Sequence, residues 1–251
     1  MRFFCLIATE DRLWNMKKAF RMLQQQYGDA IQGSCYSLWD VCQKPDAYAA
    51  MMEEARGCQY AIVYFHGGAQ ILPDFRGFWK QITAWMPAYF ESSLPDEIAE
   101  LMPSSGVTPE EYRTVQSYFQ YADADNFAAM FLAIASARFD MPCPVPPPKP
   151  PLSRGFYRPG GPIPREEEEA VLRGAAESGR PVVGLILHQS QVLNGNTKHI
   201  EAIIERLEAL GAYPLPLFTR MANDEDDKQG IKYAMGEYFI WRGRKLPDVI
   251  L

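Results

Sequence analysis

The first 86 residues alternate between short apolar runs and segments whose apolar residues recur at helical spacing. The apolar runs predict strands, and they lie at residues 3–8, 31–38 and 60–65. Continuous apolar stretches of this length are typical of strands that are buried on both faces. A helical pattern follows each run, with Gly28 at the end of the first and Pro45 in the first turn of the second. This order predicts a doubly wound parallel sheet with right-handed crossovers.

Residues 95–139 carry only helical periodicity, which is interrupted once at residues 123–126. One helix is predicted to open at residues 108–111, Thr-Pro-Glu-Glu, because threonine caps a helix, proline fits its first position and acids favour its positive end. Residues 142–164 are too rich in proline for a helix or a central strand, so we expect them to run extended. This segment separates the chain into two halves.

The second half opens with an acidic helical pattern and then alternates strand and helix patterns. Helices are predicted at residues 165–178, 198–210 and 231–241, and strands at 181–188, 213–218 and 247–251. Asn196 or Thr197 is expected to cap the helix that ends at Gly211. Pro214 and Pro216 each remove a backbone donor, so their strand is expected to be irregular or near an edge.

These patterns predict an α/β fold of two doubly wound parallel-sheet halves joined by a helical segment and a proline-rich linker. The expected organisation is an N-terminal α/β domain with a helical extension at residues 1–141, the linker at 142–164, and the start of a second α/β domain at 165–251. Because a parallel α/β half would continue beyond the last predicted strand, the chain is interpreted as the amino-terminal part of a longer protein.

Composition and charge narrow the classes of function. The chain has 251 residues, of which 47% are hydrophobic and 22% charged, with a net charge of −6. This balance argues against nucleic acid as a partner, since binding phosphates needs a concentrated basic surface. No apolar run is long enough to span a membrane and no export signal is recognisable, so a cytoplasmic location is expected. The five cysteines lack C-x-x-C pairing and are interpreted as reduced thiols.

Polar residues that follow the apolar strands are the candidate functional groups. His66 and His188 each follow a strand, and α/β sheets place their ligands in loops at the carboxyl ends of parallel strands. The loop after His188 contains residues 194–197, Asn-Gly-Asn-Thr, which also fit turn and cap chemistry alone. Each histidine, His199 included, equally fits a hydrogen-bonded loop residue, and none has a partner at ligand spacing that would indicate a metal site. The residues alone predict a cleft for a small molecule, with no phosphate-loop, dinucleotide or serine-hydrolase motif.

Residues 181–220, PVVGLILHQSQVLNGNTKHIEAIIERLEALGAYPLPLFTR, resemble a segment of the family that contains the cobaltochelatase large subunit and the porphyrin-binding H subunit of magnesium chelatase. The family pattern is a strand ending in aromatic-Arg-Ser, a Ser/Thr-Gly-Asn/Asp-Thr-like loop, a helix closing with Leu-Glu-Ala-x-Gly, and a strand with Pro-x-Phe. Weaker likenesses occur at residues 66–68, 118–131 and 155–159. The sequence departs from the family at Gln189, where the family has arginine, and at Arg158, where it has histidine.

The resemblance implies that polar groups of this chain contact a tetrapyrrole. The implied substrate-binding residues are His188, Gln189, Ser190, Asn194, Asn196, Thr197, His66 and Arg158. A corrin ring presents carboxylates and amides that such donors and acceptors can match. Glutamine at position 189 removes the planar, charged donor that an arginine would supply to a carboxylate.

The function implied by the resemblance is that of an ATP-dependent, cobaltochelatase-like ligase that inserts cobalt(II), its substrate metal, into a corrin precursor in cobalamin biosynthesis. The implied partners are AAA+ ATPase subunits that carry ATP and Mg²⁺, and the catalytic residues are expected outside this chain. Three alternatives remain open from the sequence: a stand-alone tetrapyrrole carrier or sensor, a subunit of the magnesium-chelatase H type, and an unrelated α/β enzyme acting on a phosphate or sugar.

Overall fold

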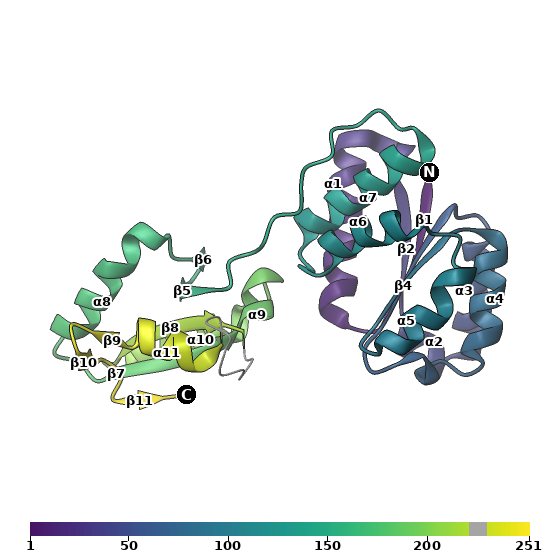
Figure 1. Cartoon of the computed structure of the whole chain (residues 1–251). Coiled ribbons are helices and arrows are strands. Elements are labelled where there is room, and N and C mark those ends of the chain that lie inside the picture. The colour runs from purple at the N-terminus through teal and green to yellow at the C-terminus, as the bar shows by residue number, and fades with distance from the viewer. Residues whose placement is uncertain (221–229) are drawn as a thin grey trace. The chain divides into compact units, whose positions relative to one another are not determined.

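The computed structural model describes residues 1–220 and 230–251, which form two compact units, Met1–Lys149 and Pro150–Leu251 (Figure 1). The first unit contains a four-stranded parallel sheet in the order β2-β1-β3-β4. Its strands are β1 (Arg2–Ile7), β2 (Gln32–Ser37), β3 (Tyr60–Phe65) and β4 (Ala88–Ser92). Its helices are α1 (Glu10–Tyr27), α2 (Leu38–Gln43), α3 (Pro45–Ala55), α4 (Phe75–Trp85), α5 (Pro95–Leu101), α6 (Pro109–Phe119) and α7 (Ala124–Phe139).

Helices cover both faces of this sheet, as the alternation of side chains along the strands requires. On one face Phe3 of β1 packs against Phe20 of α1 and Phe131 of α7, with ring centroids 6.1 and 4.9 Å away. On the other face Phe65 of β3 packs against Phe75 of α4 at 5.2 Å. The connecting helices lie on both faces because the chain reverses direction across the sheet: it passes from β1 to β2 on one side and then over β1 to reach β3 on the other. The doubly wound parallel sheet predicted for this half is therefore confirmed, and β4, which the sequence did not indicate, is added at its edge.

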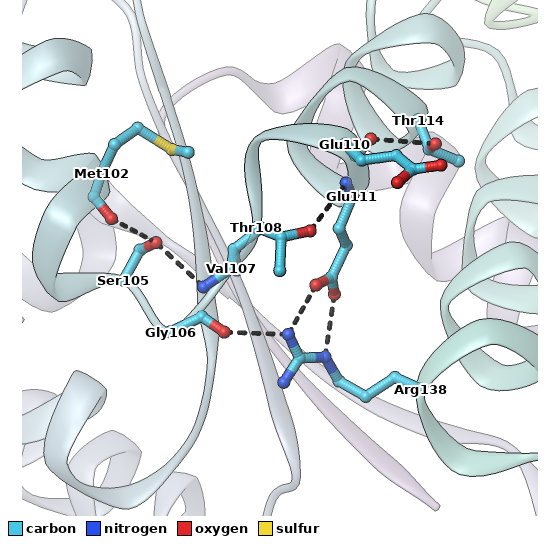
Figure 2. Close-up of polar contacts among 9 residues, drawn as sticks. All are labelled: Met102, Ser105, Gly106, Val107, Thr108, Glu110, Glu111, Thr114 and Arg138. Carbon is cyan, nitrogen blue, oxygen red and sulfur yellow. Dashed lines mark hydrogen bonds and ion pairs between the residues drawn. The ribbon is translucent and has the colours of Figure 1, made fainter.

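Polar contacts join the start of α6 to α7 (Figure 2), and the two helices also pack through apolar residues such as Phe119 and Phe127. Thr108 caps α6 as predicted, because its hydroxyl accepts a hydrogen bond from the amide of Glu111 at 3.2 Å. Arg138, near the end of α7, binds the Glu111 carboxylate through two nitrogens and donates to the carbonyl of Gly106 at 2.8 Å. The loop before α6 is thus fixed to α7.

The proline-rich segment is only partly extended. Residues 140–153 have no regular structure, but Lys149 exchanges hydrogen bonds with the side chain of Asn126, at 2.8 and 2.9 Å, and Tyr118 donates to the carbonyl of Pro146 at 2.8 Å. Residues 154–162, predicted as linker, instead form two strands of the second unit. The difference arises because Pro159-Gly160 makes a turn, with Gly160 at φ 98°, that folds the segment into a hairpin.

The second unit has a mixed five-stranded sheet in the order β11-β7-β8-β5-β6. Its strands are β5 (Arg154–Arg158), β6 (Gly161–Pro162), β7 (Val182–His188), β8 (Tyr213–Thr219) and β11 (Val249–Ile250), beside a separate hairpin of β9 (Ile240–Trp241) and β10 (Arg244–Lys245). Its helices are α8 (Glu168–Glu177), α9 (Gln189–Leu193), α10 (Lys198–Ala209) and α11 (Ile231–Tyr238). The strands β11, β7 and β8 are parallel, as expected for this half, whereas β5 and β6 add an antiparallel edge.

β8, the strand with two prolines, was expected to be irregular or near an edge. It lies inside the sheet, but the stretch that holds the prolines has no partner on the β5 side. Tyr213 donates its backbone N–H to Pro181 on the β7 side, and N–H directions alternate along a strand. The backbone nitrogens of Pro214 and Pro216, which carry no hydrogen, therefore face away from β7, toward β5. The paired stretch of β5 begins only opposite Leu217, so the missing donors fall outside that ladder.

Candidate functional site

The polar loop that joins β7 to α10 begins at His188, the last residue of β7, and we call residues 188–199 the 188–199 loop. Sequence predicted an irregular loop here, but residues 189–193 form the short helix α9. His188 caps this helix, because its ring Nδ1 accepts from the backbone N–H of Ser190 at 3.1 Å. Gln191 completes a capping box by accepting from the His188 N–H at 3.1 Å.

The capping contacts determine the form of the His188 ring. Nδ1 accepts from both the amide and, at 2.7 Å, the hydroxyl of Ser190, so it carries no proton. The neutral ring must then hold its proton on Nε2. Since His188 is exposed, this N–H is a donor that a carboxylate or amide oxygen of a ligand can accept. Ser190 does have a base beside it, which sequence reasoning had not identified, although its hydroxyl serves the cap.

Gln191 connects two histidines that lie eleven positions apart in the chain. Its Oε1 accepts from His188, so its Nε2 donates to Nε2 of His199 at 3.2 Å. This bond needs an unprotonated nitrogen on His199. Sequence reasoning did not single out Gln191, yet a glutamine three residues after a helix cap is the sequence signature of a capping box.

The Asn-Gly-Asn-Thr stretch closes the loop against the start of α10. Gly195 adopts φ 69°, a left-handed conformation that glycine tolerates, and the N–H of Asn196 donates to the Gln191 carbonyl at 2.9 Å. The side chain of Asn196 is exposed to solvent. Neither predicted cap of α10 is formed: Thr197 sits before the helix but with helical dihedral angles, and its hydroxyl donates to Glu201 at 3.2 Å instead.

Glu201 is the centre of a second group that sequence reasoning missed. Tyr157 of β5 donates to its carboxylate at 2.6 Å, beside the contact from buried Thr197. The hydrogen bond from Tyr157 lowers the pKa of Glu201, while burial and this same bond raise the pKa of Tyr157. The group ties the β5–β6 hairpin to the first turn of α10. Arg158, next to Tyr157, does not join this group in the described contacts and forms an ion pair with Glu167 at 2.9 Å.

The remaining predicted residues have different surroundings. The amide of Gln189 donates to the carbonyl of Leu152 at 2.7 Å, so it holds the chain that leads into β5. His66 belongs to the first unit and follows β3. There it contacts the hydroxyls of Tyr64 and Ser93, at 3.3 and 3.4 Å, and lines a hollow of about 590 Å³ that Arg12 and Arg113 also line. Within residues 1–220 and 230–251, no group of three or more acidic, cysteine or histidine side chains is arranged to hold a metal ion.

Comparison with known proteins places the chain in a family. The family model described as CobN/Magnesium Chelatase matches residues 116–251, more than half of the chain. The chain belongs to the CobN/magnesium chelatase family. The resemblance found in residues 181–220 is thereby confirmed, and family membership argues against an unrelated α/β enzyme.

Similar proteins in the CobN/magnesium chelatase family are much longer than this chain. The chain is 33% identical over 129 residues to the aerobic cobaltochelatase subunit CobN of Sinorhizobium sp. This aligned region covers 49% of this chain and 10% of that protein. The structure of the catalytic subunit of cobaltochelatase from Mycobacterium tuberculosis matches 90% of this chain and 17% of that one, with a TM-score of 0.57 and 16% identity. This second match shows a shared α/β fold. Among the described residues, no helix has the length and apolarity needed to cross a membrane.

Proposed function

We propose that this chain is part of a cobaltochelatase-like large subunit that takes part in the ATP-dependent insertion of cobalt(II) into a corrin-type tetrapyrrole, in cobalamin biosynthesis. The 33% identity to a cobaltochelatase CobN subunit carries this proposal. Cobalt is the substrate metal of the reaction. Following the resemblance to the family, we assign ATP and Mg²⁺ to separate AAA+ ATPase subunits, and these 251 residues contain no phosphate-binding loop motif.

Within that function we assign the 188–199 loop to contacts with the periphery of the ring. The loop follows a buried parallel strand, at the edge of the sheet where α/β proteins bind ligands. His188 offers its Nε2–H and Asn196 an exposed amide, and both fit the carboxylates and amides of a corrin. The contacts of Gln189 and Thr197 within the protein give those two residues the role of holding the loop in place.

Titration of the whole chain with a metal-free corrin, followed by the absorbance of the ring, tests this assignment. His188→Asn keeps an acceptor that can cap α9, but its side chain is too short to place an N–H where the ring Nε2 lies, and Asn196→Ala removes an exposed amide. We expect each to weaken ring binding several-fold, since a lost hydrogen bond costs about 1 kcal/mol. Glu205→Ala, at an exposed position of α10, is the matched control and should bind as the unchanged chain does.

Two results would count against the proposal in different ways. Unchanged affinity in both loop variants would remove the 188–199 loop from the binding site and leave it as a helix cap. Failure of the unchanged chain to bind the ring at about the micromolar concentrations usual for small-molecule sites would remove ring binding from this part of the subunit.

A further inference from the structure

The strand β2 forms an open edge of the sheet in the first unit. It pairs with β1 on one side only, and five of its six residues are half-buried, whereas β1 and β3 are almost wholly buried. Edge strands commonly carry proline, lysine or another charge that blocks pairing with a further strand. The sequence of β2, QGSCYS, contains none of these. The edge is therefore free of the usual obstacles to pairing.

Gly33 and Cys35, in the middle of β2, direct their backbone groups outward. Gln32 donates its N–H to Met1 on the β1 side at 2.9 Å, and the direction alternates from one residue to the next. The N–H and C=O groups of Gly33 and Cys35 therefore point away from the sheet. No hydrogen bond to these backbone groups is formed by any part of the chain that the structure describes. They match the pattern of donors and acceptors that an added strand would satisfy.

A hollow of about 510 Å³ lies along this edge and gives an added strand room. One wall is β2 and the other is a stripe of α1 with one residue from each turn: Trp14, Lys17, Arg21 and Gln24. Trp14 is 59% exposed, an unusual state for the largest side chain on a helix. Gly33 lets α1 approach, because a Cβ there would lie 2.1 Å from the ring of Phe20. The groove is thus bounded by a helix and by the open side of an edge strand.

The charge of the groove is opposite to that of the whole chain. Lys17 and Arg21 line it from α1 and Arg2 from β1, although the net charge of the protein is −6. The one acid in the lining, Glu54, accepts hydrogen bonds from the hydroxyls of Ser34 and Tyr36, which lower its pKa. The basic side chains are therefore in excess, and they favour an acidic occupant.

We propose that the edge of β2 binds an extended, acidic segment of another polypeptide, which joins the sheet as a fifth strand beside Gly33 and Cys35. Backbone hydrogen bonds supply binding in this mode, and side-chain pockets or charges supply selectivity. Lys17 and Arg21 would contact acidic side chains of the segment, and Trp14 would cover an apolar one. The proposal concerns the first unit alone and does not depend on ring binding by the 188–199 loop.

Binding is measured with the whole chain and a short fluorescent peptide that alternates valine and glutamate, by fluorescence anisotropy. A peptide that alternates valine and lysine is the charge control and should not bind. The double variant Lys17→Glu, Arg21→Glu should bind the acidic peptide about tenfold more weakly, because two rim contacts become repulsive. Absence of binding to the acidic peptide, or equal binding of the two peptides, would overturn the proposal.

The backbone contacts have a test of their own. Cys35→Pro removes an N–H that points outward, so it should leave the sheet intact and abolish binding, whereas Cys35→Ala should bind normally. If Cys35→Pro does not fold, two N-methylated peptides replace it, one methylated at every second amide and the other at the alternate amides. Only one of them should bind, since only one set of amides faces β2. Binding of both methylated peptides would refute the assignment to an acidic partner strand. So would a finding that the unchanged chain forms dimers through this edge and that Cys35→Pro prevents them.

Discussion

Arg138 and Arg76 both form ion pairs with glutamates, but only Arg138 does so where water is largely excluded. The side chains of Arg138 and Glu111 are 25% and 16% exposed, against 83% and 58% for Arg76 and Glu100. The hydrogen bonds that Arg138 donates to the Glu111 carboxylate raise the pKa of Arg138. Breaking a sheltered pair leaves an unpaired charge, whereas an exposed pair contributes little.

Arg138→Ala should therefore lower the free energy of unfolding by about 1–3 kcal/mol, a value reduced from that of a fully buried pair because some water reaches the site. Arg76→Ala, the matched control, should cost under about 1 kcal/mol. Urea unfolding of both variants measures the difference. Equal losses would mean that the contacts in Figure 2 do not stabilise the junction of α6 and α7.

Residue-scale predictions from sequence succeeded where the chemistry is local. Thr108 caps α6 because its hydroxyl reaches the amide of Glu111, three residues further along, which is the usual local contact of an N-cap. Thr197 does not cap α10, since its backbone already has helical dihedral angles, and its hydroxyl donates to Glu201 one turn later. His188 was selected as a polar residue after a strand, but its role as the cap of α9 depends on the position of Ser190 in three dimensions. These partners lie two to four residues away, so their spacing becomes informative only once the start of the helix is known.

At the scale of elements, α7 is the helix on which the first unit most depends. Its residues 127–135 are all buried, and Phe131 stacks on Phe20 of α1 at 4.2 Å while contacting Phe3 of β1. One side chain thus joins two helices and the sheet. Phe131→Ala should lower the free energy of unfolding by about 3–5 kcal/mol, the range for removing a buried aromatic ring.

Trp14→Ala is the control for Phe131→Ala, because Trp14 is a larger aromatic residue on an exposed face of α1. Its loss should cost less, about 1–2 kcal/mol, since more than half of the residue is already exposed. Thermal or urea unfolding of the two variants gives the comparison. A small effect of Phe131→Ala would show that α7 is not held by this stack.

Long periodic elements could be predicted, and short or unusual ones could not. The strands β1, β3 and β7 are apolar apart from Arg2 and His188 at two of their ends, and they were found from sequence. β4 was missed because it is five residues long and follows Pro87 directly, without a turn signal of its own. β5 was hidden in the proline-rich segment, where only pairing with β8 makes the strand recognisable.

At the scale of the whole molecule, the chain buries many phenols, and this gives it a sensitivity to alkali. Burial raises the pKa of Tyr60 and Tyr89 well above the usual range in the first unit. In the second unit burial, and then the charge of Glu168, raise the pKa of Tyr238 to about 12. Because the folded pKa exceeds the unfolded value of about 10, the associated stability is complete below pH ~10 and is lost as the pH rises through about 12.

Denaturant unfolding at increasing pH, combined with the absorbance of tyrosinate, checks this expectation. The free energy of unfolding should fall between pH ~10 and ~12, together with ionisation of the phenols. Tyr238→Phe keeps the ring and removes the phenol, so its decline should be smaller. A stability that stays constant over this range, or a variant that declines as steeply as the unchanged chain, would contradict the account.

The broad organisation of the molecule followed from sequence because it depends on averaged patterns. An α/β fold with parallel strands, and membership of the CobN/magnesium chelatase family, were both anticipated. The antiparallel edge of the second sheet was not anticipated, because the β5–β6 hairpin in that edge depends on the turn at Gly160. The contacts made by Tyr157 and Glu201 also depend on that hairpin, which is why neither residue was selected.

Hydrogen–deuterium exchange of the whole chain, with and without a metal-free corrin, tests the assignment of the 188–199 loop to ring binding most directly. Contacts between the ring and the loop should slow exchange of the amides in residues 188–199, beside His188 and Asn196, while amides on the exposed side of α8 keep their rates. Ring binding that leaves the 188–199 amides unchanged and protects another segment would contradict the proposed site.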